Sequence, residues 1–144
     1  MKNYEDPRMH TVEHILNRTM VTLFGSPRCF SSHIEKKLSK CDYRFRQLEE
    51  EEIRELERRV NEVIQKDLAI TEEFTTKEEA EKLCTMTRVP DSAGDDIRLV
   101  KVGDYDICPC IGSHVNKTKE IGTFKITTWS HKDGVLRIRF KVED

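Results

Sequence analysis

The sequence lacks several features that would assign it to a broad class at once. No apolar run approaches the length of a membrane-spanning helix, so no membrane partner is expected. There is no internal repeat and no low-complexity tract. The net charge is only −2, which argues against general binding to DNA or RNA. Any contact with RNA therefore has to use a local basic patch.

Cysteine is present, but not as a disulfide framework. The five cysteines are odd in number and irregularly spaced, and no signal peptide is recognised. Both facts indicate a reducing compartment, so we expect a cytoplasmic protein whose thiols stay available to metal. The cysteines are Cys29, Cys41, Cys84, Cys108 and Cys110.

The composition predicts one folded domain over residues 1–144. Hydrophobic and charged residues each make up 36% of the chain, and the acids and bases nearly balance. A disordered chain usually has fewer apolar residues or a larger net charge. We therefore expect an ordinary core beneath a heavily charged surface.

Local patterns predict helices and strands in mixed order. Asp6-Pro7 is a helix-start signal and Gly25 a helix-end signal around an apolar stripe over residues 9–24. A second stripe predicts a helix over 49–67, and the capping box Thr76-x-x-Glu79 predicts a short third helix. Strands are expected around Tyr43 and over 68–74, 97–102, 105–107, 121–130 and 135–142, with a loop over 89–94. These elements predict an α+β fold with helices packed on a mostly antiparallel sheet.

Two pairs of metal-binding residue types share one spacing. His10 and His14 stand four residues apart, as do Cys110 and His114. One thiolate and three imidazoles suit a tetrahedral Zn²⁺ ion. Cys110 follows His14 by 96 positions, so the fold would have to bring the pairs together. A closed set of four ligands is typical of structural zinc, whereas catalytic zinc keeps an open position.

The same residues carry a resemblance to a known family. His10-Thr11-Val12-Glu13-His14 resembles the His-x-x-x-His helix of the alanyl-tRNA synthetase editing domain. That domain also occurs in threonyl-tRNA synthetases and in freestanding AlaX proteins. Two positions depart from its Cys-Gly-Gly-Thr-His signature, since Ile111 replaces a glycine and Ser113 a threonine. The other matching segments are residues 110–115, 120–122 and 124–126, and residues 52–53, 60–64 and 97–100 also resemble the family.

The resemblance implies a freestanding editing domain without an aminoacylation domain. Its expected activity is hydrolysis of the ester between a wrong amino acid and the 3′ end of tRNA(Ala), where the wrong amino acid is serine or glycine. A pocket built for alanine rejects serine poorly, so a second site is needed to remove the error. Zn²⁺ is the implied cofactor, with His10, His14, Cys110 and His114 as its ligands.

Further residues are candidates for catalysis, substrate contact or tRNA contact. Glu13 is a candidate general base, acting on a water that zinc either activates or only positions. Substrate contacts are expected from the hydroxyls of Thr11, Ser31, Ser32 and Ser113 and from the backbone at Gly112, where glycine permits close approach. The first basic candidates for tRNA are Lys117 and Lys119. Two further groups are Lys36, Lys37 and Lys40, and Arg137, Arg139 and Lys141.

Two other functions stay open at this level. His10-x-x-Glu13-His14 also has the form of a small metallopeptidase motif, which would need a further carboxylate ligand. Glu78, Glu79 and Glu81 are the residues offered for that ligand. The chain could instead be a zinc-stabilised tRNA-binding module without hydrolase activity. The sequence leaves the oligomeric state open.

Overall fold

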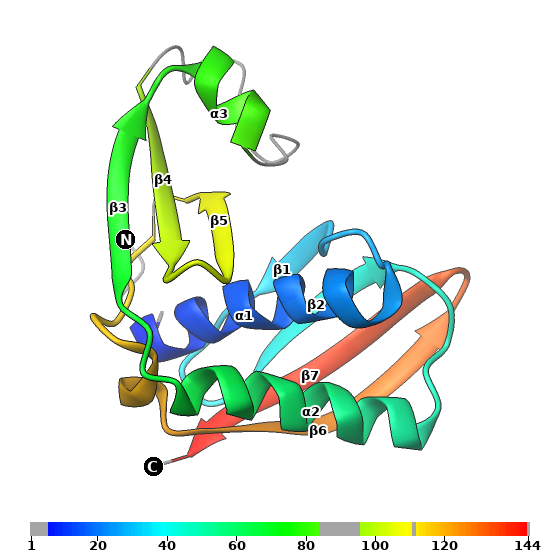
Figure 1. The fold of residues 1–144 in the computed structure, drawn as a ribbon. Helices are drawn as coiled ribbons and strands as arrows, with labels where there is room; N and C mark the ends of the chain where they lie inside the picture. The colour runs from blue at the N-terminus through cyan, green and yellow to red at the C-terminus, as the bar shows by residue number, and fades with distance from the viewer. Residues whose placement is uncertain (1–5, 84–95, 111, 144) are drawn as a thin grey trace.

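The computed structural model describes residues 6–83, 96–110 and 112–143. Within those ranges it contains three α-helices and two antiparallel sheets (Figure 1). The predicted α+β class is confirmed. The predicted loop over 89–94, Cys84 and Ile111 lie outside the described residues. None of the described helices is long and apolar enough to cross a membrane.

Helix α1 (Pro7–Phe24) begins and ends at the predicted signals. The Asp6 carboxylate accepts the Arg8 backbone N–H at 2.9 Å, and Pro7 occupies the first turn. Gly25 ends the helix in the left-handed conformation, with a φ of 70°. The helix is buried on nearly all sides, because even the polar residues Thr11, Glu13 and His14 are covered. A helix in this position can place polar side chains in a protein interior.

A four-stranded sheet lies behind α1, with strand order β1-β2-β7-β6. Its strands are β1 (Ser31–His33), β2 (Ser39–Arg44), β6 (Thr123–Lys132) and β7 (Val135–Glu143). Helices α1 and α2 (Glu50–Gln65) cover the same face of this sheet (Figure 1). Leu136, Ile138 and Phe140 of β7 belong to the core beneath them. The opposite face of the sheet carries the alternate residues of each strand.

The second sheet is smaller and has the order β3-β4-β5. It consists of β3 (Ile70–Thr75), β4 (Ile97–Val102) and β5 (Asp106–Pro109), and α3 (Lys77–Leu83) packs against β4. The sequence pattern did not predict this division of the strands. Pro109 ends β5 as expected, since proline cannot donate to a sheet ladder. Figure 1 shows β5 beside α1, which brings the residues after Pro109 to the helix.

The strand predicted from residue 121 begins slightly later. Residues Thr118–Ile121 form a short 3₁₀ helix, η2, and β6 starts at Thr123. Thr118 holds η2 against the end of α2, because its hydroxyl lies 3.0 Å from the Ile64 carbonyl oxygen. The same hydroxyl accepts the Leu68 backbone N–H at 2.9 Å. The segment that follows His114 is thereby fixed to the helical layer.

Candidate metal centre

The fold brings the four predicted ligands together. One donor atom from each of His10, His14, Cys110 and His114 lies within 4.8 Å of the other three. His10 Nε2 and His114 Nε2 are each 3.4 Å from Cys110 Sγ. Ordinary zinc–sulfur and zinc–nitrogen bond lengths in a tetrahedron give a sulfur–nitrogen separation of about 3.5 Å. The donor types and their spacing therefore fit a zinc ion.

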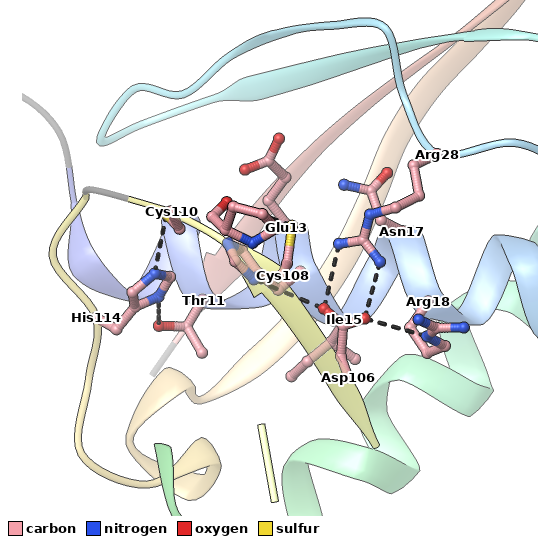
Figure 2. Close-up of polar contacts among 12 residues, drawn as sticks. Thr11, Glu13, Ile15, Asn17, Arg18, Arg28, Asp106, Cys108, Cys110 and His114 are labelled. Atoms are coloured by element: carbon pink, nitrogen blue, oxygen red, sulfur yellow. Dashed lines mark hydrogen bonds and ion pairs between the residues drawn. The ribbon is translucent and has the colours of Figure 1, made fainter. Parts of the chain in front are cut away.

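The far side of the His14 ring faces a buried carboxylate. His14 Nδ1 is 3.6 Å from Asp106 Oδ2, and the Asp106 side chain is fully buried. Arg28 donates two hydrogen bonds to Asp106 at 2.8 and 3.1 Å, and Arg18 donates a third at 3.1 Å (Figure 2). A carboxylate behind a ligating histidine orients the ring and makes it a better ligand. Asp106 is placed to do this for His14.

The tautomer of His114 is set by Thr11. The Thr11 hydroxyl donates to the Pro7 carbonyl oxygen at 2.9 Å, which uses its only proton. It therefore accepts from His114 Nδ1, also at 2.9 Å (Figure 2). It accepts the Val115 backbone N–H as well, at 3.2 Å. His114 Nδ1 thus carries the proton, and its Nε2 lone pair faces Cys110 and the other donors.

The loop that carries Cys110 is held by an arginine of β4. Arg98 donates to the carbonyl oxygens of Cys110 and Gly112, both at 2.9 Å. Glu72 on the neighbouring strand accepts from the same guanidinium at 2.6 Å. Glycine is required within this loop, because a Cβ at Gly112 would lie 1.8 Å from His10 Cε1. The predicted close approach at Gly112 is therefore toward the imidazole of His10.

The charges in the cluster favour the thiolate form of Cys110. Burial raises the pKa of this thiol, but the three surrounding histidines lower it by more, to about 3. Burial lowers the pKa of His14, whereas Asp106 and Cys110 raise it to about 9. The pKa of His114 is lowered, mainly by burial. Even without a metal ion, the site stabilises the deprotonated sulfur that a metal requires.

A second carboxylate, that of Glu13, lies near the donor atoms of the cluster. Glu13 is buried, and its Oε1 lies 3.8 Å from His10 Nε2, the nitrogen that faces Cys110. Its other oxygen lies 3.6 Å from the Cys29 sulfur. Cys41 lies close enough to both Glu13 and Cys29 for the three side chains to share a metal ion. Asp106 lies beside Nδ1 of His14, on the far side of that ring, whereas Glu13 lies beside Nε2 of His10, the nitrogen that faces Cys110. The two carboxylates therefore serve the site differently.

Comparison with known proteins finds similarity to aminoacyl-tRNA synthetases. Residues 97–139 match the family described as threonyl and alanyl tRNA synthetase second additional domain. The chain is 36% identical over 141 residues to the alanine–tRNA ligase of Fervidobacterium nodosum, covering 96% of this chain and 16% of the ligase. The chain is similar to a part of this alanyl-tRNA synthetase. The resemblance predicted from the sequence is confirmed.

Other alanyl-tRNA synthetases show the same relation. The ligase of Lactococcus lactis subsp. lactis is 34% identical over 119 residues, with 81% of this chain and 14% of the ligase covered. That of Thermoanaerobacter sp. strain X514 is 33% identical over 132 residues, with coverages of 90% and 15%. The chain thus corresponds to a small part of each synthetase. Cys110 and His114 fall inside the matched family segment, and His10 and His14 precede it.

The other residues predicted to act at the site differ in their contacts and exposure. Thr11 contacts the ligand His114, so its hydroxyl is already engaged. Ser31 is exposed and Ser32 half-buried on β1, while Ser113 is exposed in the ligand loop. Lys117 and Lys119 are exposed near η2. The metallopeptidase candidates lie on α3, and in the described ranges none joins the donor cluster; they are Glu78, Glu79 and Glu81.

Sequence reasoning did not assign roles to three charged residues of the centre. Asp106 stands four positions before Cys110, and its burial within a strand carries no local signal. Arg28 reaches it from the segment before β1, and Arg98 reaches the ligand loop from β4. The sequence held one hint of charge beside this centre. Arg18 follows His14 by four positions, so both side chains lie on the same face of the helix.

Proposed function

We propose that this protein is a zinc-dependent deacylase that removes wrong amino acids from mischarged tRNA(Ala), serine first and glycine second. The observation that carries the proposal is the meeting of His10, His14, Cys110 and His114 in a chain related to alanyl-tRNA synthetases. Its partner would be the mischarged 3′ end of tRNA. The expected location is the cytoplasm, where aminoacyl-tRNA is used.

The four donors would hold the zinc ion, and the surrounding contacts would hold the donors. When bound, zinc supplies a Lewis acid and a fixed positive charge. His14 is buried and braced by Asp106, whereas the His10 side chain is 17% exposed. Access for a substrate is therefore expected from the side of His10 and His114. A site open on one side supports a catalytic role over a purely structural one.

A small hollow beside His114 supports binding of a small group. It has a volume of about 100 Å³ and is lined by residues of β3, β4 and the segment after His114. Pockets for drug-sized molecules are about 300–1,000 Å³. The hollow would accept an amino-acid side chain but not a nucleoside. The exposed Ser113 and the backbone at Gly112 stand next to it in sequence and are proposed substrate contacts.

Glu13 is the proposed proton acceptor for the attacking water. Its Oε1 lies 3.8 Å from the donor nitrogen of His10, so it borders the space where the ester would be placed. The charge of a carboxylate there would also attract the α-ammonium group of the aminoacyl ester. Lys117 and Lys119 are exposed, follow His114 by three and five positions, and are proposed to contact the tRNA phosphates.

The deciding experiment is a deacylation assay with zinc-loaded protein. Ser-tRNA(Ala), Gly-tRNA(Ala) and Ala-tRNA(Ala) would be compared, with a His14→Ala variant as the control. Release of serine by the wild type but not the variant supports the proposal. Zinc binding without cleavage of any ester overturns it and leaves a zinc-stabilised tRNA-binding module. Loss of metal in Cys110→Ala separates this site from a metallopeptidase built on His10 and His14 alone.

The role of Glu13 has its own test. Glu13→Gln keeps the shape of the side chain and removes its charge, so kcat should fall about 10²–10⁴-fold. Zinc stoichiometry and thermal stability should stay close to those of the wild type. A variant that keeps full kcat shows that Glu13 takes no part in proton transfer. Cys108→Ser is a control, since Cys108 is a half-buried cysteine on β5 that lies outside the donor cluster.

A further inference from the structure

The face of the four-stranded sheet that the helices leave open is rich in basic side chains. Strand β7 turns Leu136, Ile138 and Phe140 toward the core, so Arg137 and Arg139 point the other way. The strand register adds basic residues from both neighbours to the same face. The open-face basic residues are Lys40, Arg44, Lys125, Lys132, Arg137, Arg139 and Lys141.

Two pairs of like charges lie directly opposite each other on this face. Lys40 of β2 is the cross-strand partner of Arg139, and Lys125 of β6 is the partner of Lys141. Directly opposed like charges destabilise an antiparallel sheet. The pairs are neighbours, because Arg139 and Lys141 are two residues apart on one strand. The folded protein thus retains a repulsion that a neutral side chain would remove.

Carboxylates neutralise only part of this charge. Asp42 accepts two hydrogen bonds from Arg137 at 2.8 and 2.9 Å, and Glu143 pairs with Lys141 at 3.0 Å. For Lys40, Lys125 and Arg139, no carboxylate oxygen of the described residues lies within 4 Å. Arg139 contacts the Thr128 hydroxyl instead, at 3.4 Å. An anionic partner would offset the remaining charge.

We infer that this open sheet face binds the phosphate backbone of tRNA, away from the 3′-terminal nucleotides. Alternate residues on a strand are spaced about 6.6 Å apart, so β7 presents a regular row of cations. A nucleic-acid backbone presents a regular row of phosphates, whereas a folded acidic protein has no such repeat. Helix α1, which carries two of the metal ligands, lies on the other side of the sheet (Figure 1). The choice of tRNA as the RNA rests on the proposed function.

The test compares two variants with the same loss of charge. Lys125→Gln with Arg139→Gln removes two of the open-face cations that have no carboxylate oxygen within 4 Å among the described residues. Arg54→Gln with Lys66→Gln removes two exposed cations, one from α2 and one from the residue that caps its C-terminus, on the side of the sheet that the helices cover. The affinity of zinc-loaded protein for uncharged tRNA would be measured by fluorescence anisotropy between 50 and 200 mM salt.

The open-face variant should bind tRNA about tenfold more weakly, and the slope of log K against log salt should fall by about 2. Its melting temperature without RNA should equal or exceed that of the wild type, because the repulsion is relieved. The α2 variant should keep the wild-type affinity and slope. Equal affinities for all three proteins, or equal losses in both variants, overturn the inference.

Deacylation by the same proteins separates this inference from the proposed function. If both hold, the open-face variant cleaves Ser-tRNA(Ala) with a raised KM and an unchanged kcat. A wild type that cleaves no ester, together with weak tRNA binding by the open-face variant, rejects the activity and keeps the RNA surface. Normal cleavage with an unchanged KM in that variant rejects the surface and keeps the activity.

Discussion

The two ligand pairs have the same spacing and are held in different ways. His10 and His14 lie on one helix, where a spacing of four residues places both side chains on one face. Cys110 and His114 lie on a loop, where that spacing fixes nothing by itself. Arg98 holds the loop carbonyl groups and Thr11 holds His114. One pair is therefore preorganised by secondary structure and the other by tertiary contacts.

The largest expected effect comes from Asp106, which braces the helical pair. Asp106→Asn leaves Arg28 without its buried partner, and breaking a buried ion pair costs about 3–5 kcal/mol of stability. Zinc affinity should also fall about 10–100-fold, because His14 loses its orienting carboxylate. Denaturant titration of the metal-free protein and competition for zinc measure the two effects.

The control for this prediction is Arg18→Met. Arg18 contacts the same carboxylate but is 32% exposed, so its loss should cost much less stability. Equal stability of Asp106→Asn and the wild type would show that the helical pair needs no brace.

An intermediate effect is expected where the two pairs meet. Gly112→Ala places a Cβ 1.8 Å from His10 Cε1, so either the loop or the imidazole has to move. Zinc affinity should fall at least about tenfold, the low end of the loss seen when the support of a ligand is changed. Competition with a chromogenic chelator measures it. The matched control is Gly25→Ala, which adds the same methyl group at a position with no neighbouring atom within 4 Å. Because the φ of Gly25 is 70°, this variant should lose stability through backbone strain and keep its zinc affinity. Unchanged affinity in Gly112→Ala would mean that the loop is not held against the helix.

The smallest effect is expected from Arg98, which supports only the loop pair. Arg98→Met keeps much of the apolar stem and removes the hydrogen bonds to the Cys110 and Gly112 carbonyl oxygens. Because the guanidinium is partly exposed, the loss of these bonds should lower the local stability of the loop by about 1–2 kcal/mol. In the metal-free variant, amide hydrogen exchange should speed up over 110–115 and stay unchanged over α1. Zinc should restore protection. Faster exchange in α1 would show that the two pairs are not held independently.

The same contrast explains what the sequence could and could not predict. Helix α1, with Asp6 and Gly25 at its ends, rests on local signals, so its bounds were predicted closely. The His-x-x-x-His and Cys-x-x-x-His spacings are also local, and they identified the four donors. Asp106, Arg28 and Arg98 act through contacts between segments far apart in the chain. Their side chains look like ordinary surface charges until the fold buries them.

The division into two sheets escaped prediction for a similar reason. Alternation of apolar and polar residues predicts a strand but not its partner. Residues 97–102 give no sign that they pair with β3 rather than β7. Thr118 fixes the junction through a buried hydroxyl, and a single threonine carries no visible signal in the sequence. Pairing partners are decided by the whole chain, whereas helix ends are decided by a few residues.

The 96 positions between His14 and Cys110 have a consequence for biosynthesis. A ribosome adds about 5–20 residues per second, so the loop ligands follow the helical ligands by roughly 5–20 s. During that interval a nascent chain offers only two of the four donors of this site. High-affinity capture has to wait for strand β5 to dock beside α1. A metal ion bound at the centre would then show that α1 and the segment after β5 have reached their native places.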